Sequence, residues 1–302
     1  MSLADIIYKK IIYRLLELYE MYPPYEWKWI VSYSGGKDSS ILLHMLFDFS
    51  EKMRFDFEVL HHDTGVEYPI LKEHIERVLN YLEDSGIRVH ITSPEKSFFE
   101  YIIERGYSFP RWNFRWCCYY LKWKPAEVFF ANAGKCLNLI AIRGDETHRP
   151  NMFIRPRFRR ERKLDVVVAS PLVDVTIDDV FFILRSINGK SPLRFDKLNK
   201  IYFDKDVRFG CWVCTVSLSK TLVYFHPKLA RIKYELVCAR CKGIKDFILK
   251  LKEYNLLSDE KINWALDIIR SSDYIEFRCG RRCSICSINH WKKRFAELLS
   301  KN

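Results

Sequence analysis

The sequence has no apolar stretch that reaches membrane-spanning length without charged residues. Its N-terminal segment, residues 4–22, has apolar residues at helical spacing. Lys9, Lys10, Arg14 and Glu17 interrupt that segment and exclude the apolar core of a secretory signal peptide. Internal repeats of useful length are also missing. With 302 residues, of which 48% are hydrophobic, the chain is predicted to be a globular protein of the cytoplasm that does not bind membranes.

Two common nucleotide-binding signatures are missing as well, the Walker A loop and the Gly-x-Gly-x-x-Gly fingerprint. A different glycine turn is present in "VSYSGGKDSS", residues 31–40, between an apolar run and "ILLHML". Two consecutive glycines let main-chain N–H groups approach a ligand, and the following helix directs the positive end of its dipole at the same point. The turn therefore predicts an anion site, with phosphate as the first candidate.

Short apolar runs alternate with helical patterns along the first part of the chain. Strands are predicted at residues 27–33, 57–63, 87–93, 137–144 and 165–172, and helices at 38–49, 69–82, 125–133 and 176–187. This alternation predicts an α/β fold, a parallel sheet wrapped by helices. Ligands of such sheets bind beyond the carboxyl ends of the strands, so the loops at 34–40, 61–69 and 142–150 are expected to converge on one pocket.

The pattern becomes mainly helical beyond residue 215, with helices predicted at 222–257 and 261–270 and breaks at Pro227 and Gly243. Residues 216–302 carry 18 Lys and Arg against 9 Asp and Glu, which accounts for most of the net charge of +12. We predict a nucleotide-binding domain over 1–215 and a smaller basic domain over 216–302. A solvated surface and a binding surface for tRNA or DNA both fit this charge, as they fit a second basic stretch that begins at Arg155 and ends at Lys163.

Three segments resemble motifs of the PP-loop ATP pyrophosphatases, which split ATP into AMP and pyrophosphate. The Ser-Gly-Gly-x-Asp-Ser turn resembles the PP-loop itself, and "HHDTGVEYP" and "IRGDETHRP" are similar to elements of the PAPS reductase-like members. The resemblance implies that these residues surround the nucleotide: Ser34, Gly35, Gly36, Asp38, Ser39, Ser40, Asp63, Thr64, Gly65, Arg143, Gly144 and Arg149. It implies ATP and Mg²⁺ as cofactors and catalytic roles for Lys37, Asp38, Asp63 and Arg143.

The same motifs have purely structural interpretations, which the sequence leaves open. A Gly-Gly turn before a helix and an Asp-Thr-Gly turn after a strand are ordinary connections, and Arg149 suits a surface salt bridge. His61 and His62 lie on a predicted strand beside the pocket. They fit either an acid–base role or hydrogen bonds that only satisfy the two rings.

Ten cysteines in a chain without a secretory signal favour metal or redox chemistry over a disulfide framework. Cys117 and Cys118 are adjacent, and adjacent thiolates fit separate iron corners of a [4Fe–4S] cluster better than they fit one zinc. Together with the Cys-x-x-Cys pair of Cys211 and Cys214 they resemble the cluster ligands of iron–sulfur APS reductases. Buried structural cysteines beside a zinc site are the alternative.

A second group of cysteines lies in the predicted C-terminal domain. Cys238 with Cys241 and Cys283 with Cys286 form two Cys-x-x-Cys pairs, which suit a structural zinc. Cys279 adds a competing grouping for a second cluster. Cys136 has no partner at metal-binding spacing and is predicted to be a packed core residue.

These motifs predict ATP-dependent activation of a substrate, with release of AMP and pyrophosphate, coupled to sulfur transfer onto nucleic acid. The model relatives are tRNA thiolation enzymes and the ATP pyrophosphatase component of DNA phosphorothioation systems, whose "GCWxCT" element is similar to "GCWVCT" here. Such an enzyme needs a sulfur donor or reductant protein as a partner. The exposed face of the N-terminal helix is a candidate surface for a homodimer.

Two alternatives to this function stay open. The first is a reductase of the small sulfonucleotides APS or PAPS. It explains the four cysteines equally well, but the C-terminal "Glu-Cys-Gly-Leu-His"-like segment that supplies the nucleophilic cysteine in such reductases is missing. The second is a non-enzymatic, nucleic-acid-binding zinc protein with an inactive nucleotide domain, although Asp38 and Asp63 are present.

Overall fold

The computed structural model describes residues 3–111, 114–146, 165–187, 191–193, 195, 198, 201–202, 207, 209–214 and 220–271. By their contacts the described residues form two compact units. The first unit lies within Met1–Asp63, Pro69–Thr92 and Lys124–Val207, and the second within Thr64–Tyr68, Ser93–Trp123 and Arg208–Asn302. The domain division after residue 215 stays a prediction made from the sequence.

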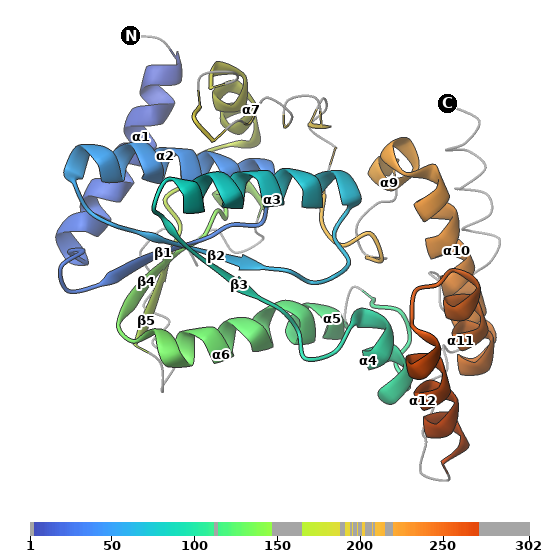
Figure 1. Ribbon diagram of the computed structural model, residues 1–302. Coiled ribbons are helices and arrows are strands. Elements are labelled where there is room, and N and C mark those ends of the chain that lie inside the picture. Colours follow the sequence, from blue (N-terminus) through green and yellow to red (C-terminus); the bar gives the residue numbers. More distant parts are fainter. Residues whose placement is uncertain are drawn as a thin grey trace. The chain divides into compact units, whose positions relative to one another are not determined.

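The first unit is built on a parallel sheet of five strands in the order β3-β2-β1-β4-β5 (Figure 1). The strands are β1 (Lys28–Ser32), β2 (Glu58–His62), β3 (Arg88–Thr92), β4 (Cys136–Leu139) and β5 (Val166–Ala169). Every pairing between neighbouring strands is parallel, so the predicted α/β class is confirmed. The predicted fourth strand is the one that differs most, because β4 ends at Leu139 and the chain continues to Arg143 as a loop.

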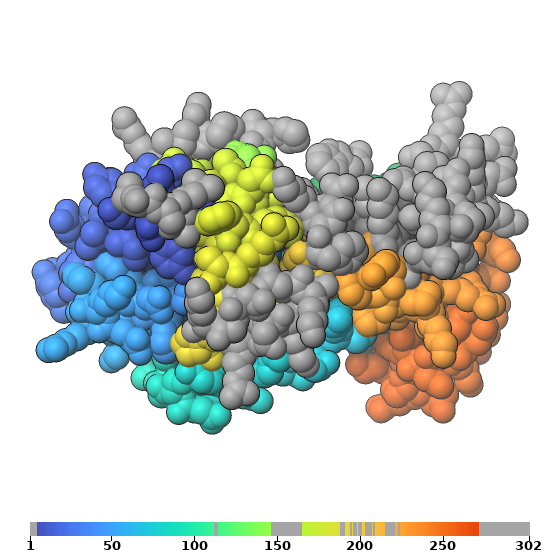
Figure 2. Space-filling model, turned by 90° about the horizontal axis from the view of Figure 1, so that it is seen from above, coloured from blue at the N-terminus to red at the C-terminus, as the bar shows by residue number. Residues whose placement is uncertain are grey.

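Helices cover both faces of this sheet. One face carries α1 (Leu3–Met21), α2 (Lys37–Met53), α3 (Pro69–Asp84) and α7 (Ile177–Ser186), which Figure 2 shows from above in dark blue, blue, turquoise and yellow. The other face is covered by α6 (Lys124–Ala133). The central helix α2 is buried along most of its length, with twelve buried residues. No helix among the described residues is both long and apolar enough to cross a membrane.

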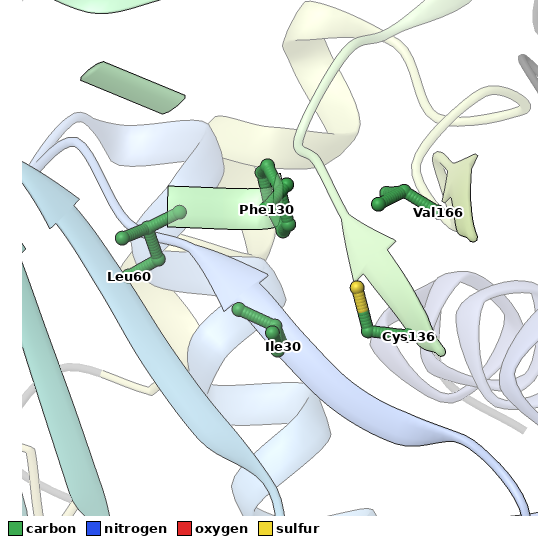
Figure 3. Packing of buried hydrophobic residues seen from close by; sticks show 5 residues of the cluster. All are labelled: Ile30, Leu60, Phe130, Cys136 and Val166. Atoms are coloured by element: carbon green, nitrogen blue, oxygen red, sulfur yellow. The ribbon is translucent and has the colours of Figure 1, made fainter. Parts of the chain in front are cut away.

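The core between the sheet and α6 is made by one side chain from each of four strands. Ile30, Leu60, Cys136 and Val166 lie on the same face of the sheet and pack with Phe130 of α6 (Figure 3). Cys136 is fully buried in this cluster, which confirms its prediction as a core residue. Burial raises the pKa of its thiol to about 11, so the thiol stays protonated and unreactive at neutral pH.

Replacing Phe130 with alanine is expected to lower the free energy of unfolding by about 3 kcal/mol, because the change removes a buried ring and leaves a cavity between α6 and the sheet. Denaturant unfolding followed by circular dichroism measures this. Val128→Ala is the matched control, since Val128 lies on the same helix but is 60% exposed. Equal losses from the two substitutions would contradict the packing described here.

The second unit is helical in its described residues. Its elements are α4 (Phe98–Glu104), α5 (Trp116–Cys118), the π-helical turn η1 (Tyr119–Trp123), α9 (Lys220–Phe225), α10 (Pro227–Lys242), α11 (Ile244–Glu253) and α12 (Asp259–Arg270). The predicted breaks are confirmed, because Pro227 is the first residue of α10 and Gly243 separates α10 from α11. Arg240 of α10 donates to the carbonyl oxygens of Gly106 and Tyr107, at 2.6 and 2.9 Å, and so joins the C-terminal helices to the earlier segment.

Candidate nucleotide-binding loop and cysteine cluster

The Gly-Gly turn connects β1 to α2 in the first unit. Gly35 has a φ of +72°, and a Cβ atom at this position would lie 2.3 Å from Cγ1 of Ile75, so only glycine fits. Gly36 precedes α2 in an extended conformation. The first N–H groups of a helix have no acceptor within it, so the turn presents main-chain donors and the positive end of a helix dipole to a ligand.

Two serine hydroxyls hold the turn in shape. The Ser39 hydroxyl donates to the carbonyl oxygen of Gly36 at 3.0 Å and accepts from the N–H of Ser34 at 3.3 Å, and the two serine Oγ atoms are 3.1 Å apart. Ser40 is fully buried, and its Oγ lies 3.5 Å from the hydroxyl oxygen of Tyr33. The predicted loop residues are therefore together, but the Ser40 side chain faces the interior beneath the loop.

Opposite charges alternate across this end of the sheet. Lys37 is only 6% exposed, and its Nζ lies 3.0 Å from Oδ2 of Asp38. Asp38 also accepts from Nη1 of Arg143, whose Nε donates to Oδ1 of Asp145 at 2.9 Å. Asp145 in turn accepts from the main-chain N–H of Ile177 at 2.9 Å, at the start of α7. Of the three loops expected to converge, the one at 34–40 and the described start of the one at 142–150 are joined by the contact between Asp38 and Arg143.

The two cations beside the loop are thus held by a shared carboxylate. Lys37 also lies 5.4 Å from the ring centre of Tyr202, which limits where its side chain can go. A polyphosphate has enough negative charge to take either cation from Asp38 and to receive bidentate hydrogen bonds from arginine. Asp145 and Tyr202 were not predicted from the sequence. Asp145 lies within the quoted "IRGDE" motif, and nothing in the sequence singles out Tyr202.

The remaining predicted residues of the first unit make contacts within the sheet and its loops. The Nδ1 atom of His61 lies 2.9 Å from the carbonyl oxygen of Tyr33, so this histidine is satisfied by the main chain. Asp63 follows β2, and its main-chain N–H donates to the carbonyl oxygen of Thr92 at 2.9 Å. Gly144 is required by close packing, since a Cβ there would lie 2.6 Å from the carbonyl oxygen of Val173. Arg149 and residues 155–163 lie outside the described residues.

The second unit brings the four predicted cluster cysteines together. The thiol of Cys117 donates to Cys118, and this hydrogen bond is the main reason that the pKa of Cys118 is lowered to about 6. The pKa of Cys117 is raised, first by that hydrogen bond and burial and then by the nearby charges of Cys118, Cys211 and Cys214. The adjacent cysteines are the last two residues of α5, just before the π-helical turn η1. They lie near the Cys-x-x-Cys loop of Cys211 and Cys214, further along the chain.

The loop with Cys211 and Cys214 is fixed by its neighbours. The main-chain N–H of Trp212 donates to the carbonyl oxygen of Val66 at 2.8 Å, and Glu67 forms an antiparallel bridge with Cys211. Thr64 lies 3.6 Å from Sγ of Cys211, and its hydroxyl donates to Oε1 of Glu67. Thr64, predicted as a nucleotide ligand, thus belongs by its contacts to the cysteine cluster. Oε2 of Glu67 is buried and has no hydrogen-bond partner among the described residues.

Two lysines supply positive charge near the four cysteines. The pKa of Lys122 is raised, chiefly by the thiolate form of Cys211. Lys233 of α10 is buried, and its pKa is lowered to about 8 because burial outweighs the attraction of Cys214 and Cys211. Neither Glu67 nor Lys233 was predicted from the sequence, because no motif connects either residue to the cysteines.

Four thiols with two nearby ammonium groups fit an iron–sulfur cluster, whose thiolate ligands leave it with net negative charge. Among the described residues, no group of three or more His, Cys, Asp or Glu side chains is already at metal-binding separations. The thiols therefore approach one another without forming a closed ligand set. Cys238 and Cys241 lie three residues apart on α10, but Cys279, Cys283 and Cys286 are outside the described residues, so the zinc site stays a prediction.

A five-stranded parallel sheet with a diglycine turn between its central strand and a buried helix defines an α/β protein of the PP-loop class. The chain belongs to the phosphoadenosine phosphosulfate reductase domain family, whose model matches residues 28–217. The match covers both the diglycine loop and the four cysteines of the cluster. Among curated proteins no significant match is found.

Several solved structures resemble the chain at low sequence identity. The phosphoadenylyl-sulfate reductase of Candida auris, in a phosphate complex, is 17% identical over 70% of this chain and 96% of its own, with a TM-score of 0.46. The FMN adenylyltransferase of Candida glabrata, with FMN and an ATP analogue, is 15% identical over 61% of this chain and 57% of its own, with a TM-score of 0.44. The U34-tRNA thiolase NcsA of Methanococcus maripaludis, with its [4Fe-4S] cluster, is 14% identical over 94% of this chain and 86% of its own, with a TM-score of 0.41. All three are enzymes.

Proposed function

We propose that the protein is an ATP-dependent sulfurtransferase that exchanges an oxygen atom of a nucleic acid for sulfur. In the first step an oxygen of the substrate attacks the α-phosphorus of ATP, the bond between the α-phosphorus and its bridging oxygen breaks, and pyrophosphate leaves. In the second step a sulfur nucleophile at the oxidation level of sulfide attacks the activated atom, and AMP leaves with the oxygen. Neither step requires an oxidant or a reductant, and a partner protein would supply the sulfur.

The observation that carries this proposal is the intact diglycine loop with two cations held by Asp38. The N–H groups at the start of α2 would receive the pyrophosphate, and Lys37 would exchange Asp38 for an outer phosphate oxygen. Arg143 would stay at the α-phosphate, since Asp145 continues to orient its guanidinium. A charge distribution of this kind stabilises a leaving pyrophosphate more than it stabilises bound ATP.

Two further groups fit residues of this chain. Asp63 at the end of β2 offers the carboxylate oxygens that Mg²⁺ prefers, and the ion would neutralise charge on the pyrophosphate. Cys117, Cys118, Cys211 and Cys214 would hold a [4Fe–4S] cluster, with one thiolate for each iron. The surroundings of the thiols support this assignment, because Lys122 and Lys233 can balance the charge of thiolates.

Nucleic acid is the preferred substrate because of the chain's charge. Residues 216–302 carry 18 Lys and Arg against 9 Asp and Glu, and this net positive charge suits a phosphate backbone. The alternative is a reductase that acts on APS or PAPS, and the family match favours it. The reductase would need no ATP.

Pyrophosphate release from ATP is therefore expected to rise when tRNA or DNA is supplied together with sulfide, with one AMP formed for each pyrophosphate. Coupled detection of pyrophosphate, with chromatography of the nucleotides, measures both products. Nucleic acid without sulfide is the control, because activation alone leaves AMP attached to the acceptor. Conversion of APS or PAPS to sulfite in the absence of ATP would support the reductase instead.

Binding to nucleic acid is expected to weaken steeply with salt. Each phosphate neutralised on duplex DNA contributes about −0.9 to the slope of log affinity against log salt concentration, and about −0.7 on a single strand. Fluorescence anisotropy with labelled RNA and DNA over a range of salt concentrations measures this slope. An affinity that does not change with salt would show that the basic residues do not contact the backbone.

A further inference from the structure

Lys233 occupies an unusual position for a lysine. It lies on α10, outside residues 28–217 that match the family model, and it is only 2% exposed. Its Nζ donates to the main-chain carbonyl oxygen of Cys214 at 2.5 Å. The charges of Cys214 and Cys211 act favourably on its ammonium group. The C-terminal helical region therefore places a buried cation against the Cys-x-x-Cys loop.

Burial of an ammonium group costs free energy unless anions or hydrogen-bond acceptors replace water. The carbonyl oxygen of Cys214 is one such acceptor. The buried ammonium group of Lys233 is thus held directly against the Cys-x-x-Cys loop.

The hydrogen bond of Lys233 also has a mechanical consequence. Cys211 and Cys214 form a tight turn, in which the N–H of Cys214 donates to the carbonyl oxygen of Cys211 at 3.0 Å. Lys233 binds the carbonyl oxygen of Cys214 at the end of the same turn and so fixes the direction in which the loop presents its two thiols. Groups that orient metal ligands in this way commonly change metal affinity by about 10- to 100-fold when they are removed.

We propose that Lys233 is a positioning residue of the iron–sulfur site, which orients the Cys211–Cys214 turn and stabilises the reduced cluster by its charge. The inference rests on the cluster of the proposed function. It adds that α10 contributes a residue to the iron–sulfur site, so that the C-terminal helices and the bound cluster stabilise each other. A positive charge beside a cluster favours the form that holds one more electron, which raises the reduction potential.

Three substitutions separate the charge from the hydrogen bond. Lys233→Met removes both, Lys233→Gln keeps a donor without the charge, and Lys233→Arg keeps both. Lys228→Met is the matched control, since Lys228 is exposed on the first turn of the same helix. Each protein is purified without oxygen and assayed for iron, for the midpoint potential of the cluster by EPR-monitored titration, and for the rate of iron loss to a chelator.

We expect more negative midpoint potentials for Lys233→Met and Lys233→Gln, and a potential near that of the wild type for Lys233→Arg and Lys228→Met. Iron loss to the chelator should be about 10-fold faster in Lys233→Met and less affected in Lys233→Gln. Wild-type potentials and wild-type iron loss in both uncharged variants would overturn the inference, as would an equal change in Lys228→Met. A wild-type protein that binds no iron is a different result, because it removes the cluster from the proposed function and this inference with it.

A second measurement needs no variant and applies if the substitutions prevent folding. Hydrogen exchange of the α10 amides is compared between wild-type protein with its cluster and the same protein after anaerobic removal of iron. If Lys233 connects α10 to the cluster, the amides near residue 233 exchange more slowly in the loaded protein. Equal exchange in the two states would overturn the inference.

Discussion

Replacing Cys118 with serine is expected to reduce the iron content of the anaerobically purified protein to less than about a tenth of the wild-type value, because a serine oxygen is a poor substitute for thiolate in an iron–sulfur cluster. Cys118 is half-buried next to Cys117 and is one of the four thiols assigned to the cluster. Its loss should leave one iron of the cluster without a thiolate. Metal analysis and the visible absorption of the cluster measure the effect.

Cys136→Ala is the control for this substitution. Cys136 is fully buried beside Ile30 and Phe130, in the first unit, and has no place in a cluster (Figure 3). The control protein should therefore keep its iron while losing some stability. Iron that survives in Cys118→Ser, or that disappears equally in Cys136→Ala, would contradict the assignment of the four cysteines. Sulfur transfer to the acceptor should disappear with the iron.

Replacing Lys37 with methionine is expected to slow pyrophosphate release from ATP by about 10²- to 10³-fold, the usual cost of removing one group that stabilises developing charge. The fold should survive the change, because Asp38 remains paired with Arg143. The effect is expected in the rate of the chemical step more than in ATP affinity, since the N–H groups of α2 still receive the phosphates. Single-turnover assays with calorimetry of ATP binding separate the two quantities.

Lys52→Met is the matched control for Lys37→Met. Lys52 lies in the last turn of the same helix and is exposed, so the two substitutions remove the same charge from opposite ends of α2. The control should release pyrophosphate at the wild-type rate. A Lys37→Met protein with more than half of the wild-type activity would exclude Lys37 from catalysis, and the proposed exchange of Asp38 for phosphate would fail with it.

Much of the first unit could be predicted because its signals are local. The alternation of apolar runs with helical patterns can be seen in consecutive residues, and it predicts the five strands and the helices that cover them. The error at the fourth strand has a physical cause. Residues 140–142 are apolar and were therefore predicted as strand. The Ser170 hydroxyl accepts from the main-chain N–H of Ile142 and donates to its carbonyl oxygen. These two hydrogen bonds hold the segment in a loop, from which Arg143 reaches Asp38.

The site was predictable only where a motif spans neighbouring residues. The diglycine loop and the cysteine pairs are of this kind. Asp145 and Lys233 are not, because their roles depend on contacts with residues that are far away along the chain, the N–H of Ile177 and the carbonyl oxygen of Cys214. The sequence also has no signal that residues 93–123 pack with the C-terminal helices, a contact made by Arg240 and by the pair of Lys261 with Glu100.

The burial of α2 has a consequence for how a nucleotide would be bound. A helix that is enclosed by the sheet and its neighbours along most of its length cannot fray at the end where the ligand arrives, and Gly35 and Ser39 fix the turn that leads into it. Its donors are preorganised, so association would lose little conformational entropy in the protein. Affinity gained in this way depends on rigidity rather than on added contacts. Substitutions that loosen the packing beneath the helix should therefore weaken nucleotide binding even though they change no residue that contacts the nucleotide.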